Sequence, residues 1–262
     1  MDKLYISLKR QTSSDFEWVV INDGSTDNTR KLFKEWTKEE RKFQIIYDEV
    51  KNGGKHRAIN KAVRMASSDA FFVVDSDDYL TDDAVENANY WFSTIKNLEE
   101  FAGVSGLRGD KAFSPIGGYG HFENDFIDCT NLQRGEYNLW GNKAEIYKTS
   151  LLKQYPFPEF ENENFITEAV VWDKIAKDGY KIRWYNRVIY ICEYLNDGLS
   201  ANLADITMNN PKGYLTYLNL LESIYGKNQA DLERLEFYQN IIKYRGNDAA
   251  LKVIKMAAQM RD

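Results

Sequence analysis

Two short runs of β-branched and aromatic residues, each followed directly by an aspartate, constrain the fold of this chain most. The runs are EWVVIN at 17–22 and AFFVV at 70–74, and Asp23 and Asp75 follow them. Apolar runs of this length are typical of buried parallel strands. Three further elements are predicted between the runs: a helix at 26–40, a strand at 44–48 and a helix at 57–66. This alternation predicts an α/β domain with a mixed, mainly parallel sheet and helices on both faces.

Oxygen-bearing side chains gather where the two predicted strands end. In open α/β sheets, ligands bind beyond the carboxyl ends of the strands, so position alone makes Asn22, Asp23 and Asp75 candidates for a site. Asp77 and Asp78 follow Asp75 within three residues. Clustered carboxylates repel one another unless a cation is present, and oxygen ligands suit magnesium or manganese shared with phosphate. The cluster therefore predicts a divalent metal site, with a solvated turn as the alternative.

Two polar turns supply further candidate ligands. Asp23, Gly24 and Ser25 join a predicted strand to a helix, where a carboxylate and backbone donors suit a base, a ribose or a phosphate. A capped turn is the alternative interpretation of this segment. In the second turn, paired glycines let the backbone approach a ligand closely, and its basic residues can offset the charge of a diphosphate. The candidate binding residues of the second turn are Asn52, Gly54, Lys55, Arg57 and Asn60.

The composition excludes several classes of protein. With 262 residues, 43% of them hydrophobic, the chain can bury a core without disulfides, and disorder is not expected. The net charge of −6 argues against a broad nucleic-acid surface. Cys129 and Cys192 fit no metal spacing and favour a reducing compartment. No apolar run approaches the roughly 20 residues that span a bilayer, so we expect a cytoplasmic protein, at most peripheral to the inner face of a membrane.

The three motifs together resemble family 2 glycosyltransferases with the GT-A fold. This chain reads DFEWVVINDGSTDNT at 15–29, NGG at 52–54 with Asn60 downstream, and DSDD at 75–78. The resemblance is close over about residues 8–82 and looser beyond them. It implies a GT-A domain at 1–204, with a nucleotide-binding part at about 1–100 and an acceptor part at about 101–204.

The residue pattern itself predicts a helix at 163–177 and, after Asn209, helices that begin near Pro211 and end at Gly226 and Gly246. Residues 205–262 are therefore predicted to form a helical C-terminal appendage.

The resemblance also implies an inverting transfer from a nucleoside-diphosphate sugar, and the expected donor is a uridine-diphosphate sugar. By similarity, Asp23 would contact the base, and Asp75 the ribose or the metal shell. Asp77 and Asp78 would hold the manganese or magnesium ion on the diphosphate. Asn22 departs from the family pattern, which commonly has aspartate at this position.

A general base is required to deprotonate the acceptor hydroxyl. Family members place it as the Asp of a Glu-Asp pair, four residues before a helical Trp. Here Glu168 stands four residues before Trp172, and Thr167 replaces the preceding acid. Glu168 is therefore the predicted base and Asp173 the next candidate, with an exposed helix carboxylate as the alternative.

One element of the family pattern is not found in this sequence. Family chains usually begin with an apolar strand that lines the nucleotide pocket, whereas this sequence opens at the following helix, near 4–11. Without that strand, the strands at 17–22 and 70–74 would lack their shared neighbour and leave backbone groups unpaired. We expect either that the natural chain is longer or that another segment fills the gap. Direct pairing of 18–22 with 70–74 would refute this expectation.

The sequence thus predicts a metal-dependent, inverting glycosyltransferase that uses a glycan or lipid-linked acceptor in surface polysaccharide assembly. Two alternatives stay open. A sugar nucleotidyltransferase also gathers acids and glycines near phosphates, although it would normally show a glycine-rich, basic loop near its N-terminus. A degenerate domain that binds nucleotide without turnover is the second alternative.

Overall fold

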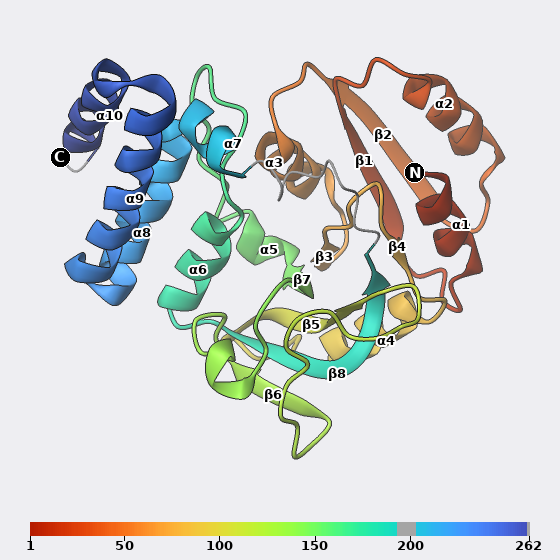
Figure 1. Ribbon diagram of the computed structural model, residues 1–262. Coiled ribbons are helices and arrows are strands. Elements are labelled where there is room, and N and C mark those ends of the chain that lie inside the picture. Colours follow the sequence, from red (N-terminus) through yellow and green to blue (C-terminus); the bar gives the residue numbers. More distant parts are fainter. Residues whose placement is uncertain (193–202, 261–262) are drawn as a thin grey trace.

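The computed structural model describes residues 1–192 and 203–260, and two separate β-sheets form its α/β part (Figure 1). The smaller sheet pairs β1 (Glu17–Asp23) with β2 (Gln44–Val50) in parallel. Helices α1 (Asp2–Arg10) and α2 (Thr29–Glu39) pack against it through aromatic side chains. Tyr5 of α1 stacks on Trp36 of α2 at 4.0 Å between ring centroids. These contacts bury the apolar sides of both helices, as their sequence periodicity requires.

The larger sheet has six strands in the order β3-β7-β5-β8-β4, with β6 also paired to β8. Its strands are β3 (Ala70–Phe72), β4 (Tyr79–Leu80), β5 (Phe101–Gly109), β6 (Phe126–Cys129), β7 (Lys143–Lys148) and β8 (Lys181–Ile191). β5 and β8 run parallel over seven residue pairs, as β1 and β2 do, and the four shorter pairings are antiparallel. The predicted mixed α/β architecture is confirmed, and its parallel part is concentrated in these two strand pairs.

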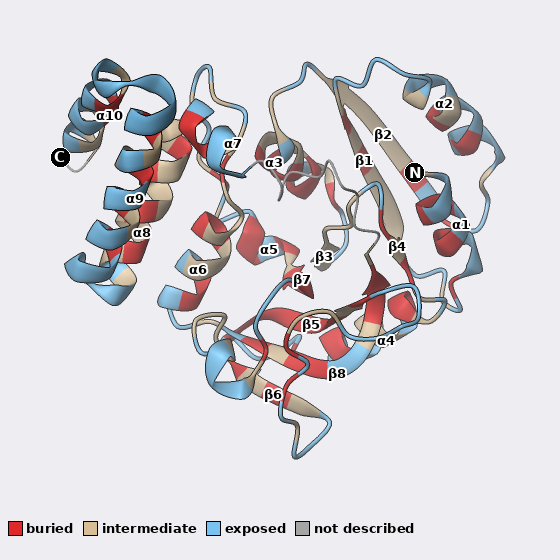
Figure 2. Cartoon of the chain, in the orientation of Figure 1, coloured by how far each residue is buried: buried red, intermediate tan, exposed pale blue. Residues whose placement is uncertain are grey.

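Further helices pack against the two sheets, and each of them contains residues that are coloured as buried in Figure 2. They are α3 (Lys55–Met65), α4 (Ala84–Ser93), α5 (Thr149–Leu152) and α6 (Ala169–Lys177), and a short 3₁₀ turn covers Arg134–Tyr137. The predicted helix at 163–177 begins only at Ala169. The Asn210 side-chain oxygen accepts hydrogen bonds from the backbone N–H groups of Asn164 and Phe165, which holds this segment outside the helix.

The two sheets do not pair with each other where the predicted central strand is missing. Within the described residues, β1 pairs only with β2 and β3 only with β7, so residues 18–22 and 70–74 make no direct ladder. β3 is three residues long, not five as predicted, and β7 is its one neighbour among the described strands. Between the sheets lies a cavity of about 190 Å³, called here the inter-sheet cavity. It is lined mainly by apolar residues, among them Leu4, Leu8, Trp18, Val19, Phe71, Phe72, Val85 and Ala88.

Four helices follow the described part of the α/β body: α7 (Leu203–Asn209), α8 (Pro211–Tyr225), α9 (Lys227–Arg245) and α10 (Asn247–Gln259). Pro211 is the first residue of α8, and Gly226 and Gly246 end α8 and α9 with positive φ angles of 85° and 82°. The predicted start and stop signals are confirmed. Leu215, Leu218, Phe237 and Ile241 are buried between these helices, and α6 lies between them and the sheets (Figure 1).

None of the helices in the described ranges is both long and apolar enough to cross a membrane. The division of the chain at about residue 204 stays a prediction.

The inter-sheet cavity generates a stability prediction. A six-residue Val- and Ile-rich segment, fused ahead of Met1 through a short flexible linker, is expected to pair with the facing edges of β1 and β3. Thermal unfolding, followed by circular dichroism, should shift upward by about 5 °C, since 1 kcal/mol corresponds to roughly 2–4 °C in a chain of this size.

The matched control carries two prolines in the fused segment, because proline cannot donate to a strand ladder. Equal unfolding midpoints for the two fusions would show that the cavity does not accept a strand.

Candidate active site

The carboxyl end of β1 is tied to the start of α3 by Asp23. Its Oδ1 accepts the backbone N–H of Gly53 and its Oδ2 accepts that of Gly54, both at 2.8 Å. The Asn52 side-chain amide also donates to the Asp23 carbonyl at 2.9 Å. The two polar turns of the sequence therefore form one unit. Gly24, with φ at +79°, lies so close to Asn52 that a Cβ would come within 2.7 Å of its backbone nitrogen.

The contacts of the Asn22 side chain explain why an amide stands where the family pattern commonly has aspartate. Its Oδ1 accepts the backbone N–H of Ser25 at 2.8 Å, and its Nδ2 donates to the Tyr47 hydroxyl at 2.8 Å. The Tyr47 hydroxyl in turn donates to Glu49 at 2.7 Å. An ionised aspartate has no proton to donate to Tyr47, so the amide suits this buried position better. Asn22 thus holds the turn that carries Ser25.

Lys55 lies at the centre of the candidate site. It is the first residue of α3, and its Nζ lies 2.5 Å from Asp75 Oδ1 and 2.8 Å from Glu168 Oε1. Partial burial lowers the pKa of Lys55, but the charges of Glu168 and Asp75 outweigh it and raise the pKa to about 12. One ammonium group therefore connects the end of the β3 segment with the residue that precedes α6.

Asp75 is surrounded by groups that favour its ionised form. Its Oδ2 accepts a 3.3 Å hydrogen bond from the Tyr190 hydroxyl and lies 3.7 Å from Arg108 Nη1. Burial raises the pKa of Asp75, but Lys55 and then Arg108 and Tyr190 outweigh this effect, so the pKa is below its usual value. The Arg108 guanidinium also stacks over the Tyr190 ring at 4.2 Å. Sequence reasoning missed Arg108 and Tyr190, whose only signal was a polar group within a mostly apolar strand.

The other two aspartates of the DSDD motif have different environments. Asp77 is exposed, whereas Asp78 is 7% exposed, and its backbone N–H donates to the Asp75 carbonyl. Across the described ranges, no group of three or more acidic, histidine or cysteine side chains is close enough to hold a metal ion by itself. Asp75, Asp77 and Asp78 thus do not form a preformed three-carboxylate site.

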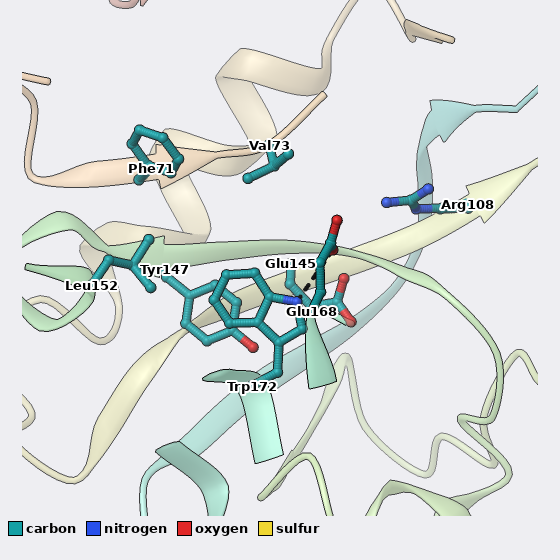
Figure 3. Close-up of a pocket in the computed structure, with 8 residues that line it drawn as sticks. All are labelled: Phe71, Val73, Arg108, Glu145, Tyr147, Leu152, Glu168 and Trp172. Atoms are coloured by element: carbon teal, nitrogen blue, oxygen red, sulfur yellow. Dashed lines mark hydrogen bonds between the residues drawn. The ribbon is translucent and has the colours of Figure 1, made fainter. Parts of the chain in front are cut away.

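Glu168 lies at the edge of a small cavity between α6 and the larger sheet (Figure 3). Its Oε2 lies 3.4 Å from Trp172 Nε1, and the Trp172 ring stacks on Tyr147 at 4.4 Å. The cavity, about 10 Å³, has room for one water molecule rather than a sugar. Glu145 points into the same cavity from β7; burial raises its pKa, although Arg134 lies 3.5 Å away. The Trp172 contact and the Lys55 ion pair together fix the Glu168 carboxylate.

Asp173, the second candidate base, has a different partner. It accepts a 2.7 Å hydrogen bond from the Asn131 side chain, and burial raises its pKa. Residues five apart on a helix point about 140° from one another. Asp173 therefore faces Asn131, whereas Glu168 faces Lys55.

Arg57 and Asn60 contact the chain itself. The Arg57 guanidinium donates to the carbonyls of Gly53, Phe160 and Glu163 at 2.5–2.6 Å. The Asn60 side chain donates to the Phe157 carbonyl and accepts the Phe157 N–H, both at 2.9 Å. Both side chains thus tie α3 to residues 157–163. That Arg57 offsets the charge of a diphosphate and that Asn60 binds the donor remain predictions.

A strand-end carboxylate, a glycine turn at a helix start and a second carboxylate held by one lysine thus lie together on an α/β fold. Residues 2–94 match the family described as glycosyl transferase family 2, so this part of the chain belongs to that family. The resemblance inferred from residues 8–82 falls within this match.

Several bacterial relatives match a larger part of the chain. Glycosyltransferase GlyA of Streptococcus pneumoniae is 38% identical over 214 residues, which cover 74% of this chain and 27% of that protein. Poly-beta-1,6-N-acetyl-D-glucosamine synthase of Staphylococcus epidermidis is 38% identical over 180 residues, which cover 66% of this chain and 42% of that protein. Teichoic acid poly(glycerol phosphate) polymerase of Staphylococcus epidermidis is 29% identical, and the match covers 84% of this chain and 29% of that protein. The chain therefore spans less than half the length of these relatives.

The fold is also similar to that of a solved transferase. The crystal structure of S. aureus TarS 1–349 in complex with UDP superimposes with a TM-score of 0.62 at 19% identity, covering 93% of this chain and 66% of that one. At this level of identity the likeness concerns the fold, and it confirms the predicted GT-A arrangement.

Gly54→Ala is expected to destabilise the protein by more than about 2 kcal/mol, because Gly54 has a φ of +97° and its Cβ would lie 1.8 Å from the Asn164 carbonyl oxygen. Urea unfolding measures the difference. Gly53→Ala is the control, since its Cβ would lie 3.0 Å from the flexible Arg57 side chain and at an ordinary contact distance of 3.6 Å from the Lys51 carbonyl oxygen. Similar losses for both variants would contradict this account of the turn.

Proposed function

We propose that the protein is an inverting glycosyltransferase that moves a sugar from a uridine-diphosphate sugar to a glycan or lipid-linked acceptor. The observation that carries the proposal is the contact of Lys55 with both Asp75 and Glu168. It brings the carboxylate at the donor end of the site within one ammonium group of a candidate base. An inverting transferase needs a site for the leaving diphosphate on one side of the anomeric carbon and a base for the acceptor hydroxyl on the opposite side.

The reaction assigns a separate task to each group. The acceptor hydroxyl oxygen forms a bond to the anomeric carbon, and the bond from that carbon to the diphosphate oxygen breaks with its electron pair. Glu168 takes the proton of the hydroxyl. Asp23 and Asn22 accept the backbone N–H groups of Gly53, Gly54 and Ser25 and so fix the two polar turns, beside which the nucleotide lies in this proposal. Lys55 offers its charge to the diphosphate when the donor enters.

The DSDD acids fit a divalent cation that is shared with the donor. Magnesium is commonly held by one or two carboxylates together with substrate phosphates, so a preformed site of three carboxylates is not required. Asp77 is exposed beside Asp75 and offers oxygen ligands only, which suits magnesium or manganese. When bound, the cation would stabilise the negative charge that develops on the leaving diphosphate.

The names of related proteins suggest which substrates to test first. One relative is a poly-beta-1,6-N-acetyl-D-glucosamine synthase, and TarS, whose fold is similar, has been crystallised with UDP-GlcNAc. We therefore take UDP-GlcNAc as the first donor and a surface polysaccharide as the product class. Such a donor places the reaction on the cytoplasmic side of a membrane.

A second candidate is a domain that binds nucleotide without turning it over. The inter-sheet cavity favours it, because β1 and β3, at whose ends the candidate site lies, share no neighbouring strand among the described residues. Release of UDP in the presence of an acceptor separates the two functions. Binding of UDP without sugar transfer or donor hydrolysis would support the second.

Glu168→Gln is expected to lower kcat by about 10²- to 10⁴-fold, the usual contribution of a general base. The dissociation constant of UDP should change less than about twofold, because in this proposal the base contacts the acceptor and not the nucleotide. UDP release and calorimetric titration with UDP and manganese measure the two quantities. Glu161→Gln, at an exposed position of the preceding loop, is the control. Full activity of Glu168→Gln would reject Glu168 as the base.

A further inference from the structure

The loop from Phe157 to Ile166 connects three parts of the molecule that are far apart in the sequence. It joins α5 to α6 and contacts both α3 and the start of α8. The loop leads directly to Glu168, and its α3 partners lie beside Lys55. Its position therefore bears on both ends of the Lys55–Glu168 ion pair.

On one side, the loop is bound to the first residues of α8. The Glu163 carboxylate accepts the backbone N–H of Lys212 at 2.8 Å and that of Gly213 at 2.9 Å. These N–H groups have no partner within a helix, so the carboxylate acts as a cap and interacts favourably with the helix dipole. Gly213 is also required by space, since a Cβ there would lie 2.6 Å from the Phe165 carbonyl oxygen.

On the other side, the same loop is bound to α3. The Glu163 carbonyl accepts a 2.6 Å hydrogen bond from Arg57 Nη1, which also donates to the Gly53 carbonyl at 2.5 Å. The next residue, Asn164, has its carbonyl against Gly54. Glu163 is thus bonded through its side chain to α8 and through its backbone to α3. Arg57 passes the connection on to the glycine turn that Asp23 holds.

We infer that Glu163 is a positioning residue, and that with Arg57 it links the C-terminal helices to the placement of Lys55 and Glu168. The contacts of Glu163 with α8 and with Arg57 are called here the Glu163 joint. In this inference, the joint sets the distance between residues 52–55 and Glu168. The inference gives α8 a part in the transfer reaction and rests on the proposed function. It also makes Arg57 a structural partner of the loop instead of a ligand of the diphosphate.

The geometry explains why a small loosening would matter. Lys55 Nζ contacts both carboxylates at 2.5–2.8 Å, so it cannot keep both contacts if α3 and the loop move apart. A displacement of about 1 Å at a reacting group costs up to about 10²-fold in rate. Donor binding is less sensitive to the Glu163 joint, because Asn22 and Asp23 are the last residues of β1 and belong neither to the loop nor to α8.

A double-mutant cycle tests the joint. Glu163→Ala, Arg57→Ala and the double variant are assayed for transfer from UDP-GlcNAc at a temperature at which circular dichroism shows all three folded. We expect kcat to fall about tenfold or more in each single variant, and no further in the double, because both remove the same link. UDP affinity should stay within about twofold, and Glu163→Gln, which keeps one acceptor oxygen, should recover part of the activity.

Hydrogen exchange gives a readout that does not need activity. Exchange of the Gly53 and Gly54 amides is expected to accelerate in Glu163→Ala, as measured on peptides that cover residues 50–58, whereas strand β5 stays protected. Glu161→Ala, two residues away and exposed, is the matched control and should match the wild type in both assays.

Three outcomes would overturn the inference. The first is an unchanged kcat in the folded single variants. The second is a fall in kcat in the double variant that equals the product of the two single effects. The third is a weaker UDP affinity with unchanged kcat in Arg57→Ala, which would assign Arg57 to the diphosphate. If the wild type transfers no sugar from any donor tested, the proposed function fails. The joint is then decided by hydrogen exchange alone, where equal rates in Glu163→Ala and Glu161→Ala would reject it.

Discussion

The Lys55 ammonium group between Asp75 and Glu168 is the interaction on which the candidate site depends. Two carboxylates this close would repel each other without a positive charge between them. Lys55 starts α3, Asp75 follows β3 and Glu168 precedes α6, so the contact joins three elements that are separate in the sequence. The two negative charges also raise the pKa of Lys55 and so keep it protonated.

Hydrogen bonds around this group fix where its three members can lie. Asp23 holds the glycine turn before Lys55, Arg108 and Tyr190 hold Asp75, and the C-terminal helices reach the loop before Glu168 through Glu163. The same arrangement has one open side. β1 and β3 face a mostly apolar cavity where a shared strand would complete the sheet.

Local patterns predicted β1, β2, the start of β3 and the C-terminal helix boundaries, because each depends on residues close together in the chain. Arg108 and Tyr190 were missed because β5 and β8 reach Asp75 only through sheet pairing. The contacts of Arg57 and Asn60 within the chain were not predicted, since nothing local shows that these partners lie about a hundred residues later. The helix before Ala169 was predicted too long, because Asn210 holds its first residues from the other end of the fold.

The most direct test of the account is a crystal structure with UDP-GlcNAc and manganese. We expect the uracil beside the Asp23 turn, the diphosphate and the cation between Asp77 and Lys55, and the anomeric carbon facing Glu168 across the space for an acceptor. A donor that orders away from Lys55, or an anomeric carbon that points away from Glu168, would contradict the account.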